Sequence, residues 1–150
     1  MIESELARQL KQAGLEWHPA KRDNFMIPGS ELSEDVFTLS DQTILIQAFN
    51  DEYTVTFHGS VEWALDHVML ADVVWLPTET QLREAIQQRL GGDGSILLYG
   101  SRTGYRCSFI YREQERVFEG VSAETAYAQA LLYLLRREAQ PERRRWVETA

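Results

Sequence analysis

The chain of 150 residues contains a single cysteine, Cys107. An intrachain disulfide is therefore excluded, and so little cysteine is typical of proteins from a reducing compartment. The longest apolar runs, at 73–76 and 130–135, are far shorter than the roughly 20 residues that a membrane-spanning helix needs. The first ten residues lack the basic-then-apolar pattern of a signal peptide. We therefore expect a cytoplasmic protein that does not insert into a membrane.

Sequence motifs of nucleotide binding and hydrolysis are missing too. Neither G-x-x-x-x-G-K-[ST] nor G-x-S-x-G occurs in the chain. The glycines at 91, 92 and 94 follow a predicted helix and precede a predicted strand, which is the reverse of the order in dinucleotide-binding folds. Cys107 shares its strand parity with Tyr105 and Phe109, which predicts a buried side chain rather than an activated nucleophile. We expect no cofactor, and no residue is predicted to be catalytic.

Lysine is scarce and negative charge is in excess. The chain has 15 Lys and Arg residues against 23 Asp and Glu residues, a net charge of −8. Residues 1–75 carry −9 and residues 76–150 carry +1. A strongly acidic surface repels phosphate backbones, so a nucleic-acid partner is not expected.

The most informative stretch is Ser122–Arg137, which predicts a long helix. Its apolar residues recur at steps of three and four, and Leu132 and Tyr133 widen the apolar arc. Ser122 is a favourable N-cap residue. A helix with so wide an apolar face should lie across a sheet.

Hydrophobic periodicity predicts the other elements. Further helices are expected at 3–14, 60–68 and 79–90, with Ser4, Ser60 and either Thr78 or Thr80 as the respective candidate caps. Period-two alternation and turn residues predict strands at 15–18, 24–27, 36–39, 43–49, 53–58, 73–76, 95–99, 105–112 and 116–120. The first two strands should form a hairpin, and the last three a meander.

This element order predicts an α+β protein with antiparallel sheet covered by helices, arranged as two α-β-α units that could pack as one domain. Pro77 marks the seam between the two units. The expected division is an N-terminal unit at 1–76, an α-β-β-β-α unit at 77–140, and a charged, frayed tail at 141–150.

Four sequence blocks carry a family resemblance: LARQLKQAGLEW (6–17), DVFTLSD (35–41), EWALD (62–66) and WLPTETQLR (75–83). In this order they resemble short bacterial proteins of unknown function that are often labelled as pilus-assembly, CpaE-like proteins. The resemblance covers about residues 4–89 and implies no catalytic residues. The pilus-assembly ATPases of that name carry a P-loop domain, whereas this chain has no glycine-lysine loop.

The C-terminal part is similar to small α-β-β-β-α modules, among them the double-stranded RNA-binding domain. That domain uses a lysine-rich start to its final helix, where this chain has Ala123, Glu124 and Thr125. The resemblance therefore implies a fold and no RNA-binding surface.

Four polar residues are candidate metal ligands: His58, Glu62, Asp66 and His67. Glu62 and Asp66 share a face of the predicted helix 60–68, and mixed nitrogen and oxygen ligands suit a divalent cation. Alternatively, the two carboxylates are the solvated side of that helix and His67 interacts with its C-terminal dipole. We favour this alternative because no H-x-x-x-H or H-E-x-x-H spacing is present.

The tryptophans predict packing or binding sites. Trp17, Trp63 and Trp75 have apolar neighbours, which favours a core or the seam between units, whereas a tryptophan at a rim would anchor a partner. Trp146 follows Arg143–Arg145 in the tail, and this segment could dock an acidic partner.

We therefore expect a non-enzymatic protein-interaction or adaptor module. Its candidate interaction residues are Trp63, Trp75, Trp146, Arg143, Arg144 and Arg145. One alternative is an acidic, secretion-chaperone-like homodimer with an open apolar groove. Another is a metal-assisted hydrolase at His58, Glu62, Asp66 and His67, and a small-molecule site in the seam is a third.

Overall fold

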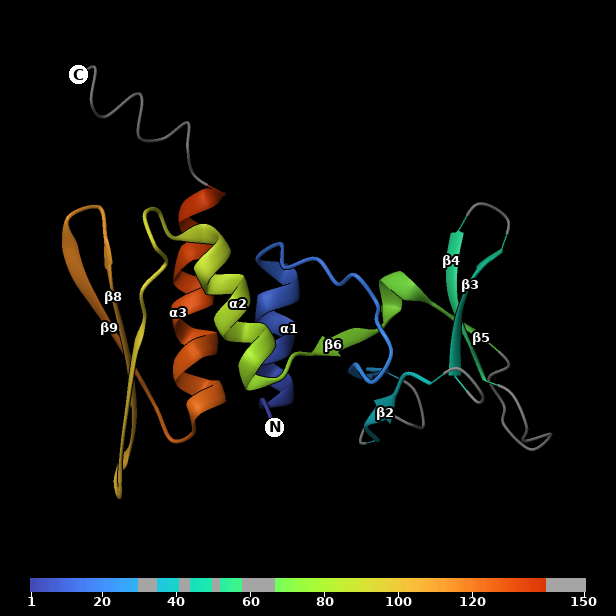
Figure 1. The fold of residues 1–150 in the computed structure, drawn as a ribbon. Helices are drawn as coiled ribbons and strands as arrows, with labels where there is room; N and C mark the ends of the chain where they lie inside the picture. Colours follow the sequence, from blue (N-terminus) through green and yellow to red (C-terminus); the bar gives the residue numbers. More distant parts are fainter. Residues whose placement is uncertain (30–34, 41–43, 50–51, 58–66, 140–150) are drawn as a thin grey trace, which may run out of the picture. The chain divides into compact units, whose positions relative to one another are not determined.

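A computed structural model describes residues 1–29, 35–40, 44–49, 52–57 and 67–139 (Figure 1). The protein belongs to the α+β class, as predicted, with three α-helices and three three-stranded antiparallel sheets in the described residues. The chain divides into two compact units. Unit 1 comprises residues 1–15 and 77–150, and unit 2 comprises residues 16–76. Unit 2 is thus inserted between the first helix and the remainder of unit 1.

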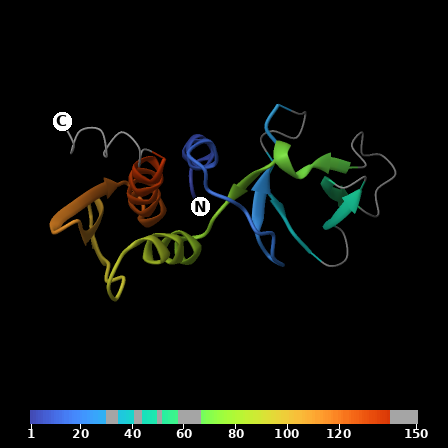
Figure 2. The same ribbon diagram turned by 90° about the horizontal axis from the view of Figure 1, so that it is seen from above.

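The described residues of unit 1 combine three helices with one sheet. Its elements are α1 (Ser4–Gln12), α2 (Glu79–Arg89), β7 (Leu97–Ser101), β8 (Gly104–Tyr111), β9 (Gln114–Gly120) and α3 (Ala123–Glu138). The sheet has the order β7-β8-β9 and is the predicted meander. Helix α3 packs on β8 and β9, while α1 and α2 pack on α3. Figures 1 and 2 both show α3 between the sheet and α1.

The central position of α3 explains its composition. Its apolar residues contact the sheet on one side and two helices on the other, so the buried surface extends around most of the helix. The buried residues are Ala123, Ala126, Tyr127, Ala128, Ala130, Leu131, Leu132, Leu134 and Leu135. The wide apolar arc in the sequence therefore reflects three packing partners rather than a sheet alone.

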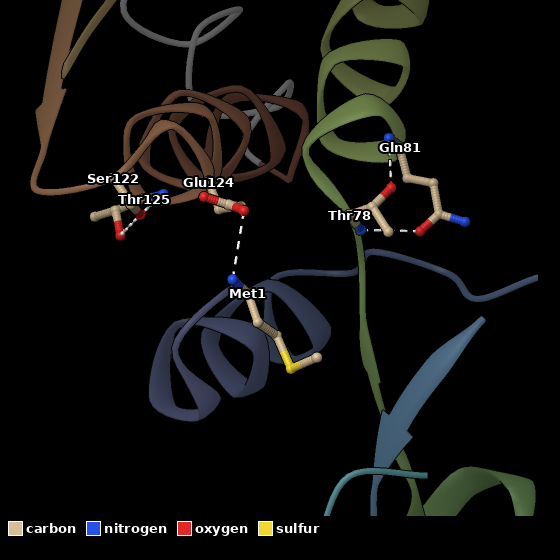
Figure 3. Close-up of polar contacts among 6 residues, drawn as sticks. All are labelled: Met1, Thr78, Gln81, Ser122, Glu124 and Thr125. Carbon is tan, nitrogen blue, oxygen red and sulfur yellow. Dashed lines mark hydrogen bonds and ion pairs between the residues drawn. The ribbon is translucent and has the colours of Figure 1, made fainter. Parts of the chain in front are cut away.

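The helix starts of unit 1 follow local sequence rules (Figure 3). Thr78 forms a capping box with Gln81, in which each side chain accepts a hydrogen bond from the other residue's backbone N–H. Ser122 accepts from the backbone N–H of Thr125 at 3.1 Å. Such caps contribute about 1 kcal/mol each. Ser122 was predicted as an N-cap, and Thr78 is the cap of α2 out of the two predicted candidates, Thr78 and Thr80.

Helix α1 begins differently from the prediction. Its N-cap is Glu3, which makes no side-chain capping bond, rather than Ser4. The Met1 ammonium lies 3.4 Å from a Glu124 carboxylate oxygen at the start of α3 (Figure 3). A hydrogen bond from its own backbone N–H lowers the pKa of Glu124, and the Met1 ammonium lowers it further. Gly14 ends the helix at φ +106°, a conformation that favours glycine.

The described part of unit 2 contains two small sheets. The strands are β1 (Asn24–Met26), β2 (Phe37–Thr38), β3 (Ile44–Phe49), β4 (Glu52–Phe57), β5 (His67–Met69) and β6 (Val74–Leu76), with a 3-10 turn η1 (Leu70–Asp72). One sheet has the order β2-β1-β6 and the other β3-β4-β5. One buried cluster of unit 2 comprises Phe25, Ile27, Phe37, Val55 and Val73, with Trp17 and Leu70 packed against it.

The predicted hairpin of 15–18 with 24–27 is wrong. Residues 15–18 form no strand, and β1 pairs instead with β2 and β6. Phe25 and Met26 point to opposite faces of β1 and are both buried, so this strand needs a central position that a two-stranded hairpin cannot provide. Trp17 packs 5.6 Å from the Phe25 ring and donates to Asp23 at 2.9 Å.

The predicted helix 60–68 is wrong at its end. His67 and Val68 belong to β5, where Val68 pairs with Val55 and His67 with Thr56. Residues 60–66 lie outside the described part of the chain. The predicted strands 43–49 and 53–58 correspond to β3 and β4, which pair antiparallel with Ile46 in register with Val55. A β-branched residue such as Val68 favours the pairing over a helical turn.

The division of the chain also differs from the expected 1–76 and 77–140. Leu6, Ala7 and Leu10 are buried in α1, and α1 packs on α3 across more than a hundred residues of sequence. Helix α1 therefore belongs to unit 1, and the described part of unit 2 contains no α-helix. The expected seam at Pro77 coincides with one boundary between the units. The expected tail, 141–150, lies outside the described residues.

Candidate functional site

The β7–β8–β9 sheet has one face covered by α3 and one open face. Along β8, Cys107 and Phe109 are buried toward α3, so the alternate residues Arg106, Ser108 and Ile110 belong to the other face. The strand register adds their cross-strand neighbours from β7 and β9. We call this surface the open face; it consists of Leu97, Tyr99, Arg106, Ser108, Ile110, Glu115, Val117 and Glu119.

The open face presents large apolar side chains to solvent. The exposed fractions are 73% for Leu97, 66% for Tyr99, 65% for Ile110 and 47% for Val117. Leu97 and Val117 flank Ser108 in one cross-strand row, so the sheet itself holds them next to each other. One exposed leucine on a protein surface needs no explanation, but several gathered on one sheet face are typical of an interaction site.

A charge pair lies within this apolar surface. The Arg106 guanidinium donates to a Glu119 carboxylate oxygen at 3.2 Å, and both side chains are more than half exposed. Exposed ion pairs of this kind stabilise a fold by at most about 1 kcal/mol. The two groups are therefore available to a partner at little loss of stability.

A hollow of about 370 Å³ adjoins the open face at the end formed by the β7–β8 turn. Tyr99, Arg106 and Glu119 belong to both the hollow and the open face. The other lining residues are Ser101, Thr103, Gly104, Tyr105, Gly120 and Val121. The hollow is therefore lined by two tyrosine rings and by the Arg106–Glu119 ion pair.

Glycines shape this end of the sheet. Gly104 has φ +148°, and a Cβ there would lie 2.8 Å from the Gly120 carbonyl oxygen. A Cβ at Gly100 would lie 3.0 Å from the Tyr105 ring, which occupies the space beside that strand. Side chains at these positions would have to displace the backbone or the tyrosine, so the hollow depends on glycine.

The cysteine predicted to be buried is buried. Cys107 is fully inaccessible, and desolvation raises the pKa of its thiol to about 11. A catalytic or redox-sensing thiol needs an accessible thiolate at neutral pH. Cys107 therefore serves as a core residue beneath α3.

Because the thiol pKa is raised, the stability of the folded protein should fall at alkaline pH. The thiol pKa is raised from 9.0 in the unfolded chain to about 11 in the folded one. The thiol thus contributes stability below pH 9 that is lost as pH rises toward 11, by up to roughly 3 kcal/mol. We expect urea denaturation to show a steeper loss of stability between pH 9 and 11 for the wild type than for Cys107→Ala. Equal slopes would contradict the prediction.

Most of the sequence-predicted site residues fall outside the described part of the chain: His58, Glu62, Trp63, Asp66, Arg143, Arg144, Arg145 and Trp146. His67 lies in β5 rather than at the end of a helix. Trp75 lies in β6 opposite Phe25 and is half-buried. Its indole Nε1 is buried and has no acceptor among the described residues. Within those residues, no group of three His, Cys, Asp or Glu side chains could hold a metal ion.

The open face was not identified from the sequence. Its signal is present in Ile96-Leu97-Leu98-Tyr99, where apolar residues occupy both parities instead of alternating. A strand covered on one face only is expected to alternate with polar residues. Without knowing what covers the sheet, this run is equally consistent with a strand buried on both faces.

Comparison with protein-family models, with curated proteins and with solved structures found no match. Among the described residues, no helix has the length and apolar character required to cross a bilayer.

Proposed function

We propose that this chain is a non-enzymatic, cytoplasmic protein-interaction or adaptor module that docks a partner protein on the open face. The observation that carries the proposal is the gathering of Leu97, Tyr99, Ile110 and Val117 on one solvent-exposed sheet face. The single buried cysteine supports a reducing compartment.

The size of the apolar surface suits a reversible contact. Burying a large apolar side chain contributes about 1.5–3 kcal/mol, so four side chains give roughly 6–12 kcal/mol before the penalties of association. Those penalties are about 4–15 kcal/mol. Binding therefore needs further contacts, which Arg106, Glu119 and the hollow can supply.

The charge distribution defines the chemistry of the partner. Unit 2 carries 2 Lys and Arg residues against 11 Asp and Glu residues, whereas unit 1 is close to neutral at +1. Unit 2 would repel an acidic protein and attract a basic one, whereas the nearly neutral unit 1 would do neither strongly. We infer a neutral or basic partner with an apolar patch. Its surface should carry an acidic group opposite Arg106 and a basic group opposite Glu119.

Two further sequence observations guide the choice of partner. The four blocks that resemble short pilus-assembly-labelled bacterial proteins make a component of pilus assembly or secretion the first partner to examine. A secretion-chaperone-like homodimer is a second candidate function, favoured by the uncharged edge of β7 described below. The metal-assisted hydrolase gains no support from a described residue.

The test is partner binding by open-face variants. Crosslinking in the native host followed by mass spectrometry supplies the candidate, which is then purified and titrated by calorimetry. Ile110→Lys/Val117→Lys should weaken binding by at least about tenfold, because two charges would be buried without partners. The matched control is Tyr53→Lys, which changes an aromatic residue of unit 2 that is 63% exposed.

Equal affinity of the open-face variant and the control would overturn the proposed docking surface. A chain truncated after Gln140 tests the tail separately. Retained affinity on truncation means that the described surface is sufficient. Lost affinity together with unchanged affinity of Ile110→Lys/Val117→Lys would place the contact in Arg143–Arg145 and Trp146 instead.

A further inference from the structure

The two edges of the β7–β8–β9 sheet differ in how they are protected. Edge strands in monomeric proteins usually carry charged residues or proline, which prevent pairing with another chain. Strand β9 has Glu115, Arg116 and Glu119 within seven residues. The segment Ser95–Ser101, which includes β7, has neither a charge nor a proline.

Strand β7 is also the least covered strand of this sheet. Helix α3 packs on β8 and β9, and β8 is the only strand paired with β7 in the described residues. Leu97 and Tyr99 are largely exposed, and Ile96 and Leu98 are only half-buried. An exposed, apolar and uncharged edge of this kind is a template for strand addition.

We propose that β7 pairs antiparallel with β7 of a second copy of this chain, so that the two three-stranded sheets join into one. The segment SILLYGS is self-complementary about Leu98. With Leu98 on the two-fold axis, Leu97 of one copy lies opposite Tyr99 of the other, and Ser95 lies opposite Ser101. Apolar residues thus meet apolar residues and polar ends meet polar ends.

The charge distribution favours a second copy over an unrelated strand. A charged residue of an unrelated strand would find no residue of opposite charge along β7. A second copy of β7 carries no charge and therefore needs no such partner. The excess negative charge lies in unit 2, at −9, while unit 1 carries +1, so the pairing surface belongs to the neutral part of the chain. Pairing would also join the two open faces, with Leu97 and Tyr99 of both copies at the centre.

This inference does not depend on the proposed partner docking, and the experiment separates the two. Sedimentation velocity of the full chain at about 1 to 100 µM should show a concentration-dependent dimer. Leu97→Lys/Tyr99→Lys places lysines opposite each other across the axis and should weaken dimerisation by about 50-fold or more. Ile110→Lys/Val117→Lys is the matched control, because it alters the open face away from β7 and should leave the dimer intact.

A charge-reversal experiment and a crosslink distinguish a lost dimer interface from an unfolded variant. Mixing Leu97→Lys/Tyr99→Lys with Leu97→Glu/Tyr99→Glu should restore a heterodimer, which a merely unfolded variant could not form. In a Cys107→Ala background and with oxidised glutathione as the oxidant, Leu98→Cys should form an intermolecular disulfide, because directly opposite residues of paired strands lie about 5 Å apart. Leu97→Cys should crosslink far less.

Three results would overturn the proposal. The first is a wild-type chain that stays monomeric up to about 100 µM. The second is a dimer that Ile110→Lys/Val117→Lys breaks and Leu97→Lys/Tyr99→Lys does not, since the interface would then be the open face. The third is dimerisation only after truncation at Gln140, since the tail would then be what covers β7.

Discussion

Replacing Leu131 with aspartate is expected to unfold unit 1. Leu131 is completely buried in α3, the helix that packs on the sheet and on the other two described helices of unit 1. Removing its side chain would cost about 2–5 kcal/mol through lost packing, and a carboxylate without a partner in this place adds several kcal/mol. The sum is comparable with the whole stability of a domain, which is about 5–15 kcal/mol.

The two units offer separate signals for this measurement. All three described α-helices lie in unit 1, so far-ultraviolet circular dichroism reports mainly on that unit. Trp17 and Trp75 lie in unit 2, so tryptophan fluorescence is weighted toward that unit. Leu131→Asp should abolish the helical signal. The control Gln129→Asp alters an exposed residue two positions away and should retain it; equal spectra for the two variants would contradict the prediction.

Replacing Gly120 with alanine is expected to destabilise unit 1 by about 2–3 kcal/mol. Gly120 ends β9 where the chain turns into α3. A Cβ at this position would lie 2.5 Å from the Ala126 backbone nitrogen and 2.8 Å from the Thr125 side chain. The first of these atoms belongs to the capped first turn of α3 and cannot move without disturbing the Ser122 cap.

Thermal unfolding with a matched glycine variant measures this effect. Each kcal/mol corresponds to about 4–8 °C in Tm for a domain of this size, so Gly120→Ala should lower Tm by at least about 8 °C. Gly91→Ala is the control, since a Cβ there meets nothing within 4 Å and the residue has no positive φ. A Tm for Gly120→Ala equal to that of Gly91→Ala would show that β9 and α3 separate without penalty.

The local features of unit 1 follow from its sequence. The caps at Thr78 and Ser122, the meander before α3 and the burial of Cys107 were all predicted correctly. Each depends on residues within a few positions of one another, such as a hydroxyl that caps the next turn or alternation within one strand. Interactions of such short range are encoded in the order of the residues themselves.

The proposed interaction surface could be located only from the tertiary structure. The sequence of β7 shows apolar residues at both parities, but whether they are buried depends on what covers each face. Helix α3 covers one face along β8 and β9, and no described element of unit 1 packs comparably on the other. The open face and the unprotected β7 edge are therefore results of how distant segments pack.

The grouping of the elements likewise depended on distant contacts. The apolar stripe of α1 predicts a buried helical face but not its partner, and α3 provides that partner from the other end of the chain. The sequence of β1 similarly predicts one strand of a local hairpin, whereas in the structure β1 pairs with the distant strand β6. The sequence by itself determined which faces are apolar and where helices begin, because those depend on neighbours along the chain. Only the tertiary structure decided which apolar faces meet and which remain in contact with solvent, because an apolar face is buried only when a second face packs against it.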